Sequence, residues 1–326
     1  MFKALVLNQQ DKVTTSSIET LDEAQLPEGD TLVRVSHSSI NYKDGLAITG
    51  KGRIIRDFPM VPGIDFVGEV IESASTEFTA GQQVVLTGWG VGENHWGGMA
   101  EKARVNASCL VPLPEKLRPE QSMMIGTAGF TAMLCVQALI DGGLTPQSGT
   151  VLVTGASGGV GSVAVTLLSE LGFSVAAATG RANENADFLT SLGASELVER
   201  SALEEPAKPL EKQLWAGVVD TVGSKVLAKA LSQTQYDGVV AACGLAGGFD
   251  LPSTVMPFIL RNVRLQGIDS VMCPKERRLA AWNSIAELLP AKFYESASTT
   301  ISLEETADYA EKITLGQTRG RVIVAL

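Results

Sequence analysis

A short apolar segment that runs directly into a glycine-rich turn constrains the fold of this chain more than any other feature. Residues 151–154 are Val-Leu-Val-Thr, and residues 155–161 are Gly-Ala-Ser-Gly-Gly-Val-Gly. Apolar residues then recur at helical spacing as far as Leu171, and Gly172 ends the pattern. A strand, a glycine turn and a helix in this order predict a nucleotide-binding unit, because the free amides at the start of such a helix attract phosphate.

The glycine turn departs from the dinucleotide fingerprint G-x-G-x-x-G at one position. Ala156 stands in place of the first glycine, whereas Gly158 and Gly161 match. The first position only requires a tight turn, so alanine is tolerable there if its φ angle stays negative. We therefore expect this turn to bind a dinucleotide through Ser157, Gly158, Gly159 and Val160.

The end of the next strand indicates which dinucleotide is bound. In NAD-binding proteins a carboxylate at this point holds the ribose 2′-hydroxyl. This chain instead has Thr179, Gly180 and Arg181, and no acidic residue comes before Glu184. A hydroxyl and a guanidinium suit a 2′-phosphate, so the sequence favours NADPH; an ordinary surface arginine after a turn is the alternative.

Strand and helix patterns divide the 326 residues into two parts. Residues 1–120 contain short strands separated by turns, at 3–7, 31–38, 67–73, 83–86 and 103–106. From residue 123 strands alternate with helices, which is typical of a parallel, doubly wound sheet. A last strand at 321–326 is expected to return to the first part.

These patterns predict an α/β protein with two domains. A β-rich, barrel-like domain takes residues 1–122 and 296–326, and a doubly wound cofactor domain takes residues 123–295. Ligands bind beyond the carboxyl ends of parallel strands, so residues 154–161, 179–181 and 244–248 should lie together.

The net charge and the cysteines restrict the binding partners and the cellular compartment that we expect. A net charge of −10 and a pI near 4.9 argue against binding to nucleic acid or to an anionic membrane. The four cysteines form no C-x-x-C pair, so we expect reduced thiols and a cytoplasmic protein. Residues 121–140 and 142–169 carry no charge, but glycines and Pro146 interrupt them, so no membrane span is predicted.

Loops in the β-rich part carry unusual side chains. Residues 88–98 include Trp89, a second tryptophan and five glycines, a composition typical of a pocket wall. Lys51, Arg53 and Arg56 place three positive charges in six residues of an acidic chain. This basic run either binds an anion or is a solvated turn.

Taken together, the motifs resemble the medium-chain dehydrogenase/reductase superfamily, and within it the NADPH-dependent acrylyl-CoA reductases, close to the quinone oxidoreductases. The resemblance runs from end to end and rests on residues 41–44, 62–68, 88–98, 126–134, 154–161, 242–248 and 256–271. The glycine turn specifies only the superfamily, whereas 88–98 and 256–271 point to the narrower branch. The resemblance implies a GroES-like β-rich catalytic domain and a Rossmann cofactor domain.

Zinc-dependent members of the superfamily bind a catalytic zinc ion through cysteine, histidine and cysteine. The matching positions here are Asn41, Ile64 and Thr127, and none of these is a thiolate or imidazole ligand. The chain has only two histidines and no group of four cysteines for a structural zinc lobe. We expect no metal in the active site.

The resemblance implies hydride addition to an α,β-unsaturated thioester, which leaves an enolate to be stabilised and protonated. Tyr42 is a candidate proton donor, because a phenol stays protonated at neutral pH. Alternatively Tyr42 only lines the cofactor pocket and water gives the proton. Asn41 and Asp65 are candidates to orient Tyr42, although buried turn hydrogen bonds would explain both.

Further contacts follow from the resemblance. Leu245 would face the nicotinamide ribose, and Ile259 and Ser270 would line the nicotinamide end, although core packing alone would explain Ile259. Thr127 is either a ligand contact or a helix cap. The strand at 263–268 ends the series, so it should be a sheet edge through which two copies form a homodimer.

Three functions remain open at this stage. The first is reduction of acryloyl-CoA to propanoyl-CoA by NADPH, with Lys51, Arg53, Arg56 and Trp89 contacting the acyl-CoA. The second is the same chemistry on quinones or free enones. The third is an NADPH-binding redox sensor without turnover. The basic run favours the first, because CoA carries phosphates and an uncharged quinone does not.

Overall fold

The computed structural model describes residues 1–326 and packs them into two units. Unit 1 comprises Met1–Thr127, Ser270–Ala286 and Tyr294–Leu326, and unit 2 comprises Ala128–Asp269 and Glu287–Phe293. Residues 270–286, which the sequence analysis placed in the cofactor domain, thus pack with the β-rich part. The division into functional domains at residues 122 and 296 stays a prediction.

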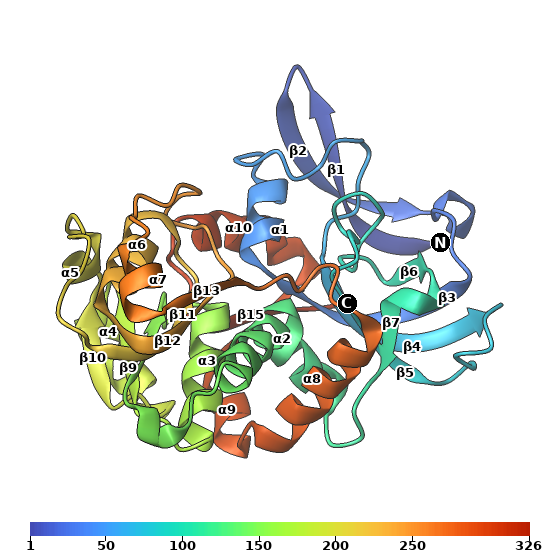
Figure 1. Ribbon diagram of the computed structural model, residues 1–326. Coiled ribbons are helices and arrows are strands. Elements are labelled where there is room, and N and C mark those ends of the chain that lie inside the picture. Colours follow the sequence, from blue (N-terminus) through green and yellow to red (C-terminus); the bar gives the residue numbers. More distant parts are fainter. The chain divides into compact units, whose positions relative to one another are not determined.

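Unit 1 is built on a seven-stranded sheet in the order β14-β15-β3-β4-β5-β7, with β6 paired to β3. A separate hairpin, β1 with β2, projects from unit 1 (Figure 1). The strands are β1 (Phe2–Gln10), β2 (Val13–Leu21), β3 (Thr31–Ile40), β4 (Asp65–Ser73), β5 (Gln83–Thr87), β6 (Lys102–Val105), β7 (Leu110–Pro112), β14 (Ser298–Ser302) and β15 (Arg321–Ala325). The last strand, β15, pairs with β3, which confirms the predicted return of the chain end.

Two helices of unit 1, α1 (Tyr42–Ile48) and α10 (Thr306–Thr314), pack against each other beside the strands β3 and β15. α1 follows β3, and α10 precedes β15. They share one apolar core that contains Ile48, Ala310 and Val322. α1 is short, so this packing rather than intrinsic helix propensity holds it in place.

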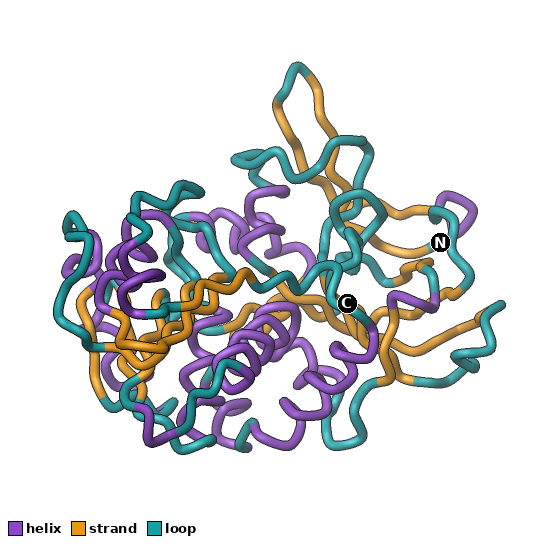
Figure 2. Tube along the Cα trace, in the orientation of Figure 1, coloured by secondary structure: helices purple, strands orange, loops and turns teal.

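Unit 2 is a parallel sheet in the order β10-β9-β8-β11-β12-β13. Helices lie on both faces of the sheet (Figure 2), which confirms the predicted doubly wound fold. The strands are β8 (Val151–Thr154), β9 (Val175–Thr179), β10 (Glu196–Glu199), β11 (Trp215–Asp220), β12 (Thr234–Ala242) and β13 (Arg264–Gly267). The order reverses between β8 and β11, and in such sheets the ligand binds beyond the strand ends at that point.

The remaining helices connect these strands and the two units. They are α2 (Pro119–Asp141), α3 (Gly159–Glu170), α4 (Ala182–Ser191), α5 (Arg200–Glu204), α6 (Ser224–Gln233), α7 (Met256–Arg261), α8 (Lys275–Leu288) and α9 (Ala291–Ser296). α2 is long and apolar enough to cross a membrane by length and composition alone, but most of it is buried inside the protein. Its backbone is also broken at Gly126, where φ is 54° and ψ is −160°. α2 therefore has the character of a core helix.

Candidate active site

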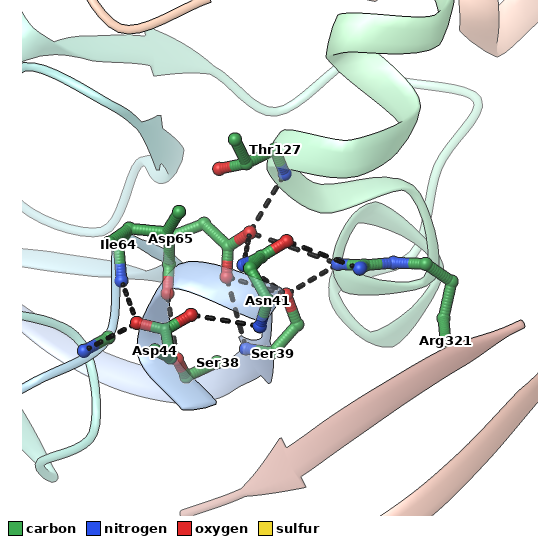
Figure 3. Close-up of polar contacts among 9 residues, drawn as sticks. Ser38, Ser39, Asn41, Asp44, Ile64, Asp65, Thr127 and Arg321 are labelled. Carbon is green, nitrogen blue, oxygen red and sulfur yellow. Dashed lines mark hydrogen bonds and ion pairs between the residues drawn. The ribbon is translucent and has the colours of Figure 1, made fainter. Parts of the chain in front are cut away.

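A buried polar network occupies the point where β3 ends and α1 begins (Figure 3). Asn41 is the residue before α1, and its backbone N–H donates to the Asp44 carboxylate at 2.9 Å. The same carboxylate accepts hydrogen bonds from the backbone N–H groups of Gly63 (3.2 Å) and Ile64 (3.0 Å). Asp44 thereby fixes the first turn of α1 to the loop before β4.

Asp65, the first residue of β4, is the centre of this network and is fully buried. One carboxylate oxygen accepts from the backbone N–H (3.1 Å) and the hydroxyl (2.6 Å) of Ser39. The other accepts from the Asn41 side-chain amide and the Thr127 backbone N–H, both at 2.8 Å. The four donors come from three parts of unit 1, so one carboxylate joins β3, the start of α1 and the break in α2.

Arg321, the first residue of β15, supplies the positive charge of the network. Its guanidinium is 2% exposed and lies 3.9 Å from the Asp65 carboxylate. It donates to the Ser39 hydroxyl at 2.6 Å and to the Asn41 side-chain oxygen at 3.2 Å. Because an isolated buried charge is very unfavourable, the acid and the arginine depend on each other.

Burial dominates the electrostatics of this site. It raises the pKa of Asp44 to about 7, and the nearby charge of Asp65 acts in the same direction. Burial also lowers the pKa of Arg321, which the two carboxylates oppose. Asp44 consequently keeps its proton at a pH where an exposed aspartate is fully ionised.

Gly126 shows why α2 is broken beside this network. A Cβ at this position would lie 2.4 Å from the Arg321 guanidinium and 2.8 Å from the Asp65 carboxylate. The positive φ of Gly126 turns the chain so that the next N–H, that of Thr127, meets Asp65. Only glycine combines that backbone conformation with the missing side chain.

The structure brings Asn41, Asp65 and Thr127 together, and their roles in an active site stay predictions. Neither Asn41 nor Asp65 bonds to the phenol of Tyr42, whose residue is 38% exposed at the start of α1. The observed bonds are those of the buried-turn alternative. Any effect on Tyr42 is therefore transmitted through the first turn of α1.

The three cations of the basic run, Lys51, Arg53 and Arg56, differ in their contacts. The ammonium group of Lys51 bonds to Glu311 at 2.8 Å and to the Thr314 hydroxyl at 3.1 Å, both on α10. Arg53 and Arg56 are exposed. Lys51 is thus already paired with a carboxylate, and the predicted anion contacts of the three cations stay a prediction.

In unit 2 the glycine turn leads into α3 as predicted. Gly155 has φ 59°, and a Cβ on Gly161 would lie 2.3 Å from the Gly155 carbonyl oxygen, so that glycine is required for packing. A Cβ on Gly158 would meet only that same oxygen, at 3.3 Å, so the face over Gly158 is open. No side chain caps the first turn of α3. The open glycine face and the uncapped amides fit a dinucleotide pyrophosphate.

Two arginines lie at the end of β9: Arg181, which the sequence analysis named, and Arg200 from α5. Thr179 shares a hydrogen bond of 3.0 Å with Ser157, which joins the strand end to the glycine turn. Arg181 follows and lies 4.0 Å from Glu184. Arg200 from α5 lies against Gly180, because a Cβ there would be 3.0 Å from its guanidinium carbon. Sequence reasoning missed Arg200, which stands in a short helix without any local motif.

The other predicted cofactor residues lie at loops. Gly244 packs on the turn after β11, where an added Cβ would lie 2.0 Å from the Thr221 carbonyl oxygen. Leu245 and Ile259 have largely exposed side chains in unit 2. Ser270 belongs to unit 1, and its carbonyl oxygen accepts a hydrogen bond from Arg278. Their contacts with a cofactor stay predictions.

The donor set does not fit a catalytic zinc ion. Asn41 and Thr127 both donate to Asp65, and Ile64 precedes it, so the three positions of the zinc ligands do converge. They present an amide, an alkyl chain and a hydroxyl instead of thiolates and imidazole. No three His, Cys, Asp or Glu side chains gather as a metal site in residues 1–326. Catalysis without a metal stays a prediction.

Comparisons with known proteins agree with this arrangement. Residues 27–115 match the alcohol dehydrogenase GroES-like domain, and residues 159–287 match the zinc-binding dehydrogenase family. The chain is 60% identical to the probable acrylyl-CoA reductase AcuI of Escherichia coli and 52% identical to the acrylyl-CoA reductase AcuI of Ruegeria pomeroyi, each over 99% of both chains. The yhdH oxidoreductase of Salmonella enterica, solved in complex with NADP, is 59% identical, with a TM-score of 0.98 over 99% of both chains.

Full-length identity at this level establishes a family, not only a fold. The chain belongs to the medium-chain dehydrogenase/reductase superfamily and, within it, to the quinone oxidoreductase-like family that contains the acrylyl-CoA reductases.

Proposed function

We propose that this protein is an NADPH-dependent acrylyl-CoA reductase that converts acryloyl-CoA into propanoyl-CoA. The observation that carries the proposal is the 60% identity, over 99% of both chains, with the Escherichia coli protein that bears this name. The two arginines at the end of β9 support NADPH as the reductant. The four free cysteines support a cytoplasmic location.

Different residues bind the cofactor and donate the proton. The amides of residues 157–160 hold the cofactor pyrophosphate, and Arg181 with Arg200 holds the 2′-phosphate. The bound cofactor supplies a hydride for the β-carbon of the acrylyl group. Tyr42 then donates a proton to the α-carbon of the resulting enolate, while the Asn41–Asp65–Arg321 network fixes the helix turn that carries it.

A comparison of acceptors tests this function. Initial rates of NADPH oxidation should be highest with acryloyl-CoA, lower with crotonyl-CoA and lowest with a small quinone. Tyr42→Phe should lower kcat by about 10²–10⁴-fold if the phenol gives the proton, the usual contribution of general acid catalysis. A preference for the quinone would identify a quinone reductase instead. An unchanged kcat in Tyr42→Phe would assign the proton to water.

We further propose that Arg53 and Arg56 bind the phosphates of CoA. The variant Arg53→Ala/Arg56→Ala should raise the KM for acryloyl-CoA about tenfold and leave kcat nearly unchanged, because remote contacts contribute equally to ground and transition states. Lys51→Ala is the matched control, since Glu311 already neutralises Lys51. Unchanged CoA-ester kinetics in the double variant would show that the run is a solvated turn.

We also propose a homodimer formed through β13. This strand is an edge of the unit 2 sheet. Val255 and Leu260, at the start of and within the helix α7 that precedes β13 in the chain, are exposed apolar side chains. Edge strands of this kind pair readily with a second copy. Sedimentation equilibrium at micromolar concentration should give twice the chain mass of 34.3 kDa. A single-chain mass would contradict the proposal.

A further inference from the structure

One buried arginine joins two loops, which the family resemblance places at the acyl-CoA and at the nicotinamide end of the cofactor. Arg278, on α8, is 1% exposed. One guanidinium nitrogen donates to the carbonyl oxygen (2.6 Å) and the hydroxyl (2.7 Å) of Thr87. The other donates to the carbonyl oxygens of Ser270 (3.1 Å) and Val271 (3.2 Å). The planar fork of an arginine suits such a double attachment, which a lysine ammonium cannot reproduce.

The same guanidinium covers the ring of Trp89. Its carbon atom lies 4.9 Å from the ring centroid, a cation–π distance. The backbone N–H of Trp89 donates to the Val271 carbonyl oxygen at 3.0 Å. Arg278 and Trp89 therefore bond to the same carbonyl group from two directions, and the three segments form one junction.

The backbone of this junction is strained. The strain lies at Trp89, whose φ of 59° is rare for a bulky aromatic residue, whereas the φ of 84° at Gly88 is ordinary for glycine. The Trp89 indole N–H is also buried without an acceptor in the protein. Strained conformations persist only where the surroundings over-determine them, and they concentrate at functional sites. Here the surroundings are the Arg278 guanidinium and the loop that it holds.

Gly88 shows how closely the two loops approach. A Cβ on Gly88 would lie 2.9 Å from the Val271 carbonyl oxygen and 3.0 Å from that of Ser270. Both oxygens also accept hydrogen bonds from Arg278. The contact leaves no room for a side chain, so the loops cannot shift independently.

We propose that Arg278 is a positioning residue for the reduction. It fixes residues 270–271, so that Ser270 meets the nicotinamide end of the cofactor, and it fixes Trp89 as a wall of the acyl pocket. This inference rests on the proposed function and on the expected contacts of Ser270 with the nicotinamide end and of Trp89 with the acyl-CoA, which the family resemblance implies. Arg278 itself acts through the two loops and not by contact with the reacting atoms.

The test uses Arg278→Met and Arg278→Lys in the full chain. Because a misplacement of about 1 Å at the reacting atoms costs about 10²-fold in rate, kcat for acryloyl-CoA should fall about 10–100-fold in Arg278→Met. The KM for acryloyl-CoA and the preference for NADPH over NADH should stay within about threefold, because the CoA phosphates and the 2′-phosphate are bound elsewhere. Arg278→Lys should recover only a small part of kcat.

Two further measurements separate positioning from simple loss of structure. Arg277→Met, which removes the exposed neighbouring arginine on α8, is the matched control and should behave as the parent. Tryptophan fluorescence should change in Arg278→Met, and the change should be absent when Trp89 is also replaced by phenylalanine. Gly88→Ala disturbs the same junction without removing a buried charge, and it should show the same fall in kcat even if Arg278→Met does not fold.

The outcomes distinguish this inference from the proposed function. If the parent reduces acryloyl-CoA and the folded Arg278 and Gly88 variants keep kcat within twofold, Arg278 does not position the site. A parallel loss of NADPH preference would likewise reduce its role to general stability and overturn the inference. If the parent reduces only quinones, the proposed substrate is wrong, and the same kcat comparison with a quinone still decides the role of Arg278. A parent without any turnover overturns both.

Discussion

Replacing Arg321 by methionine is expected to lower the free energy of unfolding by about 3–5 kcal/mol, the usual effect of removing one partner from a buried ion pair. The Asp65 carboxylate would keep its buried position but lose the neighbouring guanidinium. Ser39 and Asn41 would each lose a hydrogen bond as well. Urea unfolding of parent and variant, followed by circular dichroism, measures the difference.

The double variant Arg321→Met/Asp65→Asn provides the control for this prediction. It should be more stable than Arg321→Met alone, because neutralising Asp65 removes the uncompensated buried charge. A loss of less than about 1 kcal/mol in Arg321→Met would give the pair the small worth of an exposed salt bridge and contradict the prediction.

The second large effect is expected on cofactor choice. Each of Arg181→Ala and Arg200→Ala should weaken NADPH binding by about 1.5–3 kcal/mol, the worth of a hydrogen bond to a charged group. The double variant should lose most of the preference for NADPH, whereas NADH binding should hardly change because NADH lacks the 2′-phosphate. Fluorescence titrations of both cofactors measure these affinities.

The controls follow from the same geometry. Arg277→Ala removes an exposed arginine from unit 1 and should leave both affinities unchanged. Equal losses for NADPH and NADH in the double variant would mean that the arginines bind a group common to both cofactors. If Arg181→Ala weakens NADPH binding and Arg200→Ala does not, then Arg200 has only a structural role, in its ion pair with Glu204.

Local patterns in the sequence predicted most of the fold. The strand–turn–helix of unit 2 was recognised because burial on both faces gives parallel strands an unbroken apolar composition. β2 was missed because its threonine and serine side chains are mostly exposed and show no apolar alternation. β7 was missed because three residues are too few to show a period.

The candidate site was predictable only where its residues are close in sequence. Asn41 and Asp44 stand at capping-box spacing, and Asp65 begins β4 within the segment 62–68 that carries the resemblance. Arg321 is 280 positions from Asn41, and no local signal connects the two. Arg278 has the same difficulty, since its partner Thr87 is 191 positions away. Arg200 lies against Gly180 from a different helix, and no local motif connects the two. One sequence shows the type of such residues but not their partners.

The position of β15 in the sheet of unit 1 has a consequence for folding during translation. β15 lies between β14 and β3 in the sheet. The pairing of β3 with β15 therefore cannot form until residues 321–325 have been translated. All of unit 2 has left the peptidyl-transferase centre before then. The part of the chain that is translated first therefore matures last, and the edge of β3 at residues 37–40 stays open throughout that interval. Open strand edges on nascent chains are sites of aggregation, so this segment is where a chaperone would be needed.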